Sequence, residues 1–159
     1  MSQFVCNRNS RIVRTTGGKI QGYFYNDVFN FKGVPYRVAE RFHSPKPVPY
    51  TEGIFDATNY GAVCPVLSVP KPTTELKIPH RLWVENEDCL NLNIWTPALD
   101  DKKRPVLVWL HGGGLRDGSS IEQLAYEGYN AAKKGDIVVV SVNHRLNVLG
   151  YFDLSAFGR

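Results

Sequence analysis

The sequence predicts an α/β fold that opens with antiparallel hairpin strands and continues with central, mostly parallel strands joined by a crossover helix. Residues 11–32 carry short β-type segments separated by turn residues, which is the pattern of hairpins. Continuous apolar runs rich in valine lie at 105–110 and 136–142, as expected for strands buried on both faces. Helical spacing between these runs predicts a right-handed crossover and a parallel pair.

The hairpin region is followed by a long segment for which little regular structure is predicted. Hairpin turns are expected at 17–18 and 26–27, where glycine, asparagine and aspartate favour tight loops. Seven of the ten prolines lie in 35–72, and proline disrupts both strand ladders and helix interiors. We therefore expect ordered loops over 33–82, with 65–79 as the least structured part.

The second half of the chain alternates between strand-like and helix-like patterns. Residues 90–95 alternate with period two and predict a strand with one buried face. Residues 121–134 have helical spacing, with Ser120 and Gln123 as a candidate capping box. The sequence Lys-Lys-Gly at 133–135 is typical of a helix C-terminus.

Composition and charge exclude several classes of function. The formal net charge of +4 is mild, and the basic residues form no stripe with stacking aromatics, so nucleic-acid binding is not predicted. No apolar run approaches the length of a membrane span, so no membrane partner is predicted. Residues 1–10 lack an apolar core segment; no signal peptide is predicted, and a cytoplasmic location is the expectation.

The three cysteines lack the paired spacing of a metal site, and no metal is predicted. Cys64 and Cys89 are candidates for a disulfide that closes a loop, which leaves Cys6 over. Because cytoplasmic thiols are kept reduced, we expect Cys64 and Cys89 to be free.

The most informative stretch is a predicted strand, 105–110, that ends in His111, Gly112, Gly113 and Gly114. Glycines have no side chain to cover their backbone N–H groups, so neighbouring N–H groups can converge on one position. Such an arrangement can stabilise an oxygen that becomes negative during acyl transfer. His-Gly-Gly-Gly sequences form oxyanion holes in lipases and esterases. No Gly-x-Ser-x-Gly nucleophile elbow occurs in the 159 residues, and the nearest lookalike, at 117–120, is not expected to hold a nucleophile.

Ordered sequence motifs extend over nearly the whole chain. They lie at 31–36, 41–45, 87–94, 108–114 and 135–152. Together they resemble the N-terminal part of the type-B carboxylesterase family, which includes cholinesterases and bacterial esterases of the para-nitrobenzyl type. The resemblance implies that residues 1–159 are the N-terminal part of a single α/β-hydrolase domain, cut off before the nucleophile elbow. The catalytic serine, acid and histidine of the family come later.

The resemblance also implies roles for particular residues. Gly113 and Gly114 match two oxyanion donors, with Gly112 and His111 in support and the family's catalytic base far downstream. Arg41 and Glu87 match a buried ion pair. The crossover helix is moved to a start near Tyr129, because the three residues before it match a loop motif. Trp83 is assigned to packing or to a pocket wall. Three residues depart from the family pattern: Leu115, where an aromatic residue is usual, His144, where tyrosine is common, and Asn147, where glycine is common.

The resulting hypothesis is a parent protein that hydrolyses small-molecule carboxylic esters through a serine acyl-enzyme, with no cofactor. This segment supplies the oxyanion hole and is inactive alone. Two alternatives stay open: a non-catalytic, cholinesterase-like binding or adhesion protein, and an inactive truncated gene product. The oligomeric state is not predicted.

Overall fold

The computed structural model describes residues 5, 12–67, 81–153 and 155–157. Cys6 and most of the segment 65–79 therefore lie outside the described residues. The elements are β1 (Ile12–Thr15), β2 (Gly18–Gln21), β3 (Tyr23–Tyr25), β4 (Val28–Pro35), β5 (Ile54–Asp56), β6 (Asn91–Thr96), β7 (Val106–Leu110), η1 (Leu124–Tyr126), α1 (Tyr129–Gly135), β8 (Val138–Val142), α2 (Asn147–Gly150) and η2 (Ser155–Phe157). None of the described helices is long and apolar enough to cross a membrane.

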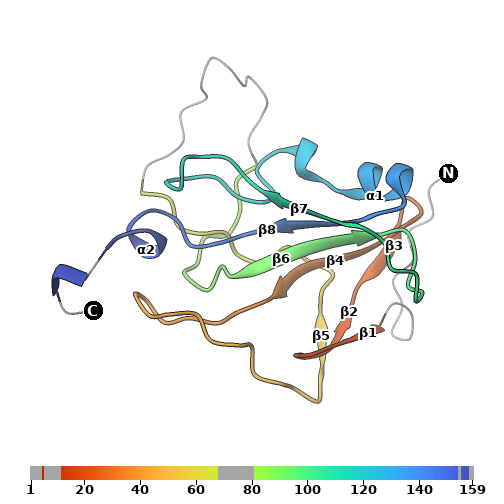
Figure 1. Ribbon diagram of the computed structural model, residues 1–159, viewed down its shortest axis with the longest axis horizontal. Coiled ribbons are helices and arrows are strands. Elements are labelled where there is room, and N and C mark those ends of the chain that lie inside the picture. Colours follow the sequence, from red (N-terminus) through yellow and green to blue (C-terminus); the bar gives the residue numbers. More distant parts are fainter. Residues whose placement is uncertain (1–4, 6–11, 68–80, 154, 158–159) are drawn as a thin grey trace.

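The strands form two sheets, with α1 packed on one side of the larger one (Figure 1). The five-stranded sheet has the order β3-β4-β6-β8-β7, and the three-stranded sheet has the order β1-β2-β5. Both expected hairpins are confirmed: β1 pairs antiparallel with β2, and β3 with β4. Asn26 and Asp27 turn between β3 and β4 with φ of 54° and 61°, the left-handed conformation that tight hairpin turns require. The short strand β5, parallel to β2, was not expected from the sequence.

The crossover is confirmed, because β7 runs parallel to β8 and α1 connects them. The capping box at Ser120 and Gln123 is wrong: Gln123 precedes η1 and makes no side-chain cap. The helix begins only at Tyr129, since Gly128 packs its backbone against the core. A Cβ on Gly128 would lie 2.6 Å from Val139 and 2.7 Å from Trp95.

Strand β6 buries a polar face, which the period-two pattern did not predict. Asn91, Asn93 and Trp95 are buried, whereas Leu92 and Ile94 on the other face are half-buried. The alternation and the single buried face are confirmed, and the buried face is the one that carries the asparagines. Buried amides are tolerated here because each has hydrogen-bond partners, as set out below.

Strand β7 forms an edge of the sheet. All five of its residues are exposed, with Val106, Val108 and Leu110 at 58% or more. In the described part of the chain β7 pairs with β8 alone. Burial on both faces, expected for this run from its sequence, is therefore not found within these residues.

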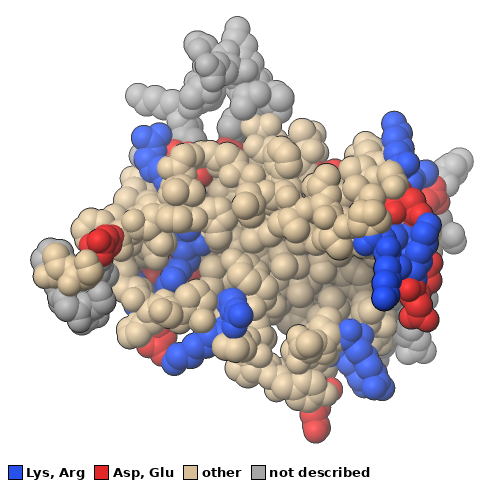
Figure 2. Space-filling model, in the orientation of Figure 1, with Lys and Arg blue, Asp and Glu red and all other residues tan. Residues whose placement is uncertain are grey.

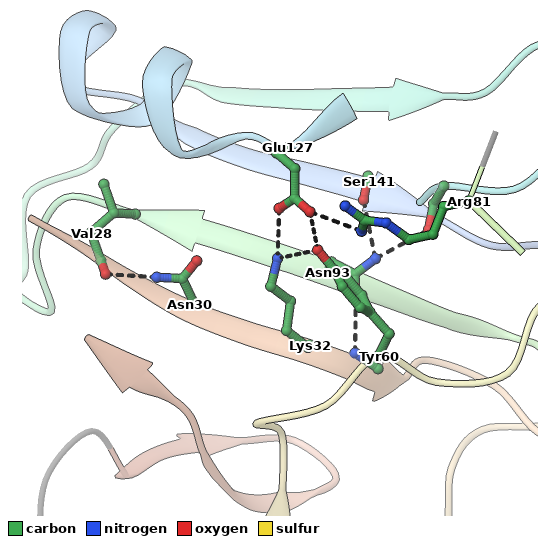
Figure 3. A network of polar contacts seen from close by, with 10 residues as sticks. Val28, Asn30, Lys32, Tyr60, Arg81, Asn93, Glu127 and Ser141 are labelled. Atoms are coloured by element: carbon green, nitrogen blue, oxygen red, sulfur yellow. Dashed lines mark hydrogen bonds and ion pairs between the residues drawn. The ribbon is translucent and has the colours of Figure 1, made fainter. Parts of the chain in front are cut away.

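A buried ionic cluster, the Lys32 cluster, joins β4 to the segment before α1 (Figure 3). It consists of Lys32, Tyr60, Arg81 and Glu127. The Lys32 Nζ lies 3.2 Å from a Glu127 carboxylate oxygen, 3.0 Å from the Tyr60 hydroxyl and 3.8 Å from the centre of the Trp95 ring. Glu127 also accepts hydrogen bonds from the Tyr60 hydroxyl and from Arg81, the latter at 3.1 Å.

Burial and the neighbouring charges have opposite effects on the pKa values of Lys32 and Glu127. Burial favours the neutral form of each side chain, whereas the partner of opposite charge favours the ionised form. Burial lowers the pKa of Lys32 to about 8, although the Glu127 carboxylate opposes the shift. Burial alone would raise the pKa of Glu127, but Lys32, Tyr60 and Arg81 together lower it. Such a pair adds little net stability compared with apolar residues, but removal of one partner leaves a buried charge uncompensated.

Charged side chains also gather at one end of the molecule, where both signs are mixed (Figure 2). The Arg104 side chain is only 8% exposed and pairs with Asp100 and Asp136, the latter at 2.7 Å. Lys102 also pairs with Asp136, and Lys133 lies 2.6 Å from Asp27. These cations are partnered by carboxylates and do not form a basic patch.

The exposed β7 edge predicts self-association. We expect the 159-residue chain, expressed alone, to form oligomers or aggregates, because open apolar strand edges pair with other chains. V108K in the middle of β7 should reduce the oligomer fraction in size-exclusion chromatography, whereas L82K, at an even more exposed apolar residue outside the sheet, should not. A monodisperse wild-type monomer with one sharp thermal transition would contradict this expectation.

The Lys32 cluster predicts an acid-dependent stability. E127Q should lower the free energy of unfolding at pH 7 by about 3 kcal/mol, because it leaves Lys32 buried without its counter-charge. The folded-state pKa of Glu127 lies below its ordinary value of 4.5, so its contribution is present above that pH and is lost as the pH falls through the folded pKa. Urea denaturation from about pH 3 to 7 should therefore show that the difference in the free energy of unfolding between wild type and E127Q becomes smaller as the pH falls.

The matched control is E52Q, which changes an exposed glutamate outside the cluster. Its stability should follow the wild-type curve at every pH. The electrostatic account of the cluster would be refuted if E127Q were as stable as wild type at pH 7. It would also be refuted if the difference in unfolding free energy did not change with pH.

Candidate active site

The glycine loop, residues 112–118, begins just beyond the carboxyl end of β7, on the side of the sheet where α2 lies (Figure 1). Gly113, Gly114 and Leu115 have φ of 118°, 62° and 63°, so the chain turns through three consecutive left-handed residues. Only glycine fits at 113, since a Cβ there would lie 1.9 Å from the carbonyl oxygen of Asp117. The turn is closed by Gly113 O, which accepts the amides of Arg116 at 3.1 Å and Asp117 at 3.3 Å.

Several backbone donors of the loop, the amides of Gly113 and Gly114 among them, have no hydrogen-bond partner in the described part of the chain. Gly112, Gly113 and Gly114 are all exposed. No group of the described residues accepts a hydrogen bond from the amide N–H of Gly113 or Gly114. Unpaired N–H groups on neighbouring residues can together bind an anionic oxygen, because they carry partial positive charge and need no reorganisation.

His111 lies buried beneath this loop. Its Nδ1 donates to Gly112 O at 2.7 Å, which places the proton on Nδ1. Its Nε2 is buried and has no hydrogen-bond partner in the described part of the chain. The ring stacks on His144 with centroids 4.8 Å apart and planes at 8°. Burial lowers the pKa of His111, which favours the neutral ring.

The far side of the loop folds back onto this histidine. A Cβ on Gly118 would lie 2.6 Å from Gly112 O and 2.9 Å from His111 Nδ1. Ser119 and Ser120 are buried, at 6% and 1% exposure, so neither is presented to solvent as a nucleophile. The expectation that this lookalike motif is not an elbow is consistent with their position.

Buried asparagines connect the loop to the sheet. The Asn93 side chain accepts the Gly33 amide at 3.0 Å and donates to the hydroxyls of Ser120 at 3.1 Å and Ser141 at 3.2 Å (Figure 3). Sequence reasoning missed this role. The signal was present as two asparagines that alternate with apolar residues in a predicted strand, because an amide that becomes buried there needs specific partners.

A second amide continues the network beyond β8. Asn143 Oδ1 accepts the backbone N–H of Ser120 at 2.9 Å, and Asn143 Nδ2 donates to Asn91 Oδ1 at 3.1 Å. The Asn143 carbonyl accepts the Tyr36 hydroxyl at 3.1 Å. Ser120, two residues after Gly118, is thus held by both asparagines.

The expected ion pair forms, but at the surface. Arg41 Nε lies 2.9 Å from both carboxylate oxygens of Glu87. The side chains are 63% and 31% exposed, so the prediction of a buried pair was wrong. Hydrogen bonding to Arg41 lowers the pKa of Glu87, and solvent screens the pair.

Cys64 and Cys89 lie together in a small apolar cluster with Leu146, which confirms that they are neighbours. Both are free thiols and both are buried. The hydrogen bond between them raises the pKa of Cys89 and lowers that of Cys64, whose sulfur also accepts the Leu146 amide at 3.1 Å. Trp83 is 42% exposed, packs edge-on against Tyr60 and lines a pocket, as expected.

Among the residues that the structure describes, no group of three or more histidine, cysteine, aspartate or glutamate side chains is placed to hold a metal ion. The two histidines beside the glycine loop are stacked face to face.

The sequence matches the model of the carboxylesterase family over residues 9–157. It is 37% identical over 151 residues to the para-nitrobenzyl esterase of Bacillus subtilis (strain 168), covering 92% of this chain and 30% of that protein. It is 39% identical over 149 residues to the phenmedipham hydrolase of Pseudarthrobacter oxydans, covering 88% of this chain and 29% of that protein.

Solved structures give the same result for the fold. An esterase from anaerobic Clostridium hathewayi that can hydrolyze aliphatic aromatic polyesters has a TM-score of 0.93 at 50% identity, covering 99% of this chain and 32% of that one. The carboxylesterase of Geobacillus stearothermophilus has a TM-score of 0.77 at 39% identity, covering 91% and 28%. The chain spans about 30% of the length of the curated relatives it matches. It belongs to the carboxylesterase family and forms part of the α/β-hydrolase fold of that family.

Proposed function

We propose that the protein carrying this chain hydrolyses carboxylic esters of small molecules through a serine acyl-enzyme, and that Gly113 and Gly114 supply two donors of its oxyanion hole. One observation supports the proposal: the amide N–H groups of Gly113 and Gly114 have no partner among the described residues, and they lie on neighbouring exposed residues just beyond the end of a parallel strand. Family membership supports the ester as substrate class.

The proposed reaction has two steps. A serine hydroxyl outside this chain attacks the ester carbonyl and passes its proton to a histidine, and the carbonyl oxygen becomes an anion. That anion accepts hydrogen bonds from Gly113 and Gly114, and then the alcohol leaves with the proton from histidine. Water next gives a proton to the histidine as it attacks the acyl-serine, and a second oxyanion forms at the same donors. The acid then leaves as the histidine returns that proton to the serine oxygen.

The contribution of this chain is rigidity at the donors. Loss of one oxyanion-hole donor slows turnover by about 10²–10³-fold in related chemistry. His111 holds the carbonyl of Gly112, and the turn after Gly114 is closed by bonds to Gly113 O, so the donors are fixed before substrate binds.

Activity and serine labelling test the proposal. The whole protein should hydrolyse para-nitrophenyl acetate and should react with a fluorophosphonate at one serine. The 159-residue chain alone should do neither, since it has no elbow serine. A whole protein that neither hydrolyses esters nor reacts would favour the non-catalytic binding protein, and stoichiometric labelling of the isolated chain would refute the assignment of the nucleophile.

A pair of glycine variants tests the donors themselves. G113A should lower kcat of the whole protein by about 10²-fold or more, because its Cβ collides with the Asp117 carbonyl and the loop must rearrange. G114A meets no atom within 4 Å and suffers only the left-handed φ, so its loss should be about tenfold or less. G53A, where a Cβ also meets nothing within 4 Å, is the control and should match wild type. Equal activities for G113A and G53A would exclude Gly113 as a donor.

A further inference from the structure

We propose that Asn147 is a positioning residue that holds the glycine loop in its donor geometry. The inference rests on the proposed oxyanion function of Gly113 and Gly114 and adds a residue that does not touch the substrate. It also gives a role to one of the positions at which this chain departs from the family pattern.

Asn147 contacts the loop directly after the donors. Its backbone N–H donates to the carbonyl of Leu115 at 2.8 Å. Its side-chain Nδ2 donates to the carbonyl of Pro65 at 2.9 Å and, at a longer 3.5 Å, to that of Arg116. An amide nitrogen carries two hydrogens and can serve both carbonyls. One residue therefore ties the loop to a segment that is about fifty positions away in sequence.

The loop needs such a tie because its backbone is strained. Leu115 has φ of 63°, a conformation that residues other than glycine, asparagine and aspartate rarely adopt. Strain of this kind persists only where the surroundings hold it. Among the described residues, the backbone N–H of Asn147 holds the Leu115 carbonyl from outside the loop. The Asn147 side chain holds the carbonyl of the next residue, Arg116.

Asparagine suits position 147 for two reasons. Asn147 is itself left-handed, with φ of 49°, and asparagine tolerates this region better than other side chains. Glycine, which the family resemblance leads one to expect here, would keep the turn and the backbone bond but would lack the amide. The side-chain bonds to Pro65 and Arg116 are thus an addition made by this chain.

The Asn147 contacts affect the amides of Gly113 and Gly114 through the turn that Arg116 closes. Gly113 O accepts the Arg116 amide, so movement of Arg116 would shift Gly113 and Gly114 together. The other end of the loop is held through Ser120 by the buried asparagines. Asn147 is the corresponding anchor on the outer side, where the loop is exposed.

The test compares N147G with N26G in the whole protein. Asn26 is also left-handed, with φ of 54°, but lies in the β3–β4 turn, away from the glycine loop. N147G should lower kcat for para-nitrophenyl acetate by about tenfold at an unchanged KM, because the donors act in the transition state. It should also speed hydrogen exchange of the peptide spanning 112–118 by about the same factor. N26G should change neither quantity.

A second variant covers the case in which glycine rearranges the turn. N147D keeps the left-handed preference and the acceptor oxygen that receives the Leu149 amide, but presents a carboxylate oxygen to the carbonyls of Pro65 and Arg116. It should lose more kcat than N147G. If N147G and N147D both match N26G in kcat and in exchange, the inference is overturned.

The outcomes separate this inference from the proposed function. If G113A retains full activity, the oxyanion assignment fails, and faster exchange over 112–118 in N147G would still establish Asn147 as the loop anchor. If G113A is inactive and N147G is unchanged in kcat and exchange, only the role of Asn147 fails.

Discussion

Asn93 lies fully buried in β6, and its side-chain amide joins β4, the segment after the glycine loop, and β8 through Gly33, Ser120 and Ser141. An apolar side chain of similar size would leave these three polar groups buried and unpaired, at a cost of about 1–3 kcal/mol each. Asn143 repeats the arrangement one strand further on and bonds the backbone of Ser120. The sheet can therefore place the glycine loop accurately only while these amides keep their partners. The donors, His111 and the outer anchor are all built on this frame.

Much of the fold follows from local sequence signals. Turn residues at 26–27 and the valine-rich runs report on the conformation of their immediate neighbours, and the hairpins and crossover they predict are present. Burial was less predictable, because it depends on what packs against each face. The exposed edge of β7 and the buried asparagine face of β6 were not predicted for this reason. A pattern of apolar residues gives the period of a strand but does not say what packs against each face.

The candidate site likewise has features that the sequence predicts and features that depend on the folded surroundings. The glycine loop was predicted because consecutive glycines after a strand permit the positive φ angles of a tight turn and leave the backbone N–H groups uncovered. The resemblance added the pairing of Arg41 with Glu87. It did not give the exposure of that pair, which depends on neighbouring segments. Lys32 and Glu127 are 95 positions apart, and no local pattern relates them. Their pairing, like the contacts of Asn93, is a property of the folded chain.

The central claim is that the amides of Gly113 and Gly114 bind the oxygen that becomes negative during ester hydrolysis. A crystal structure of the whole protein, phosphonylated at its catalytic serine by a fluorophosphonate, tests it most directly, since the phosphonyl group mimics the tetrahedral intermediate. The account predicts the phosphonyl oxygen at about 2.7–3.1 Å from both amide nitrogens. An adduct whose oxygen is turned away from Gly113 and Gly114, with other donors bound to it, would contradict the account.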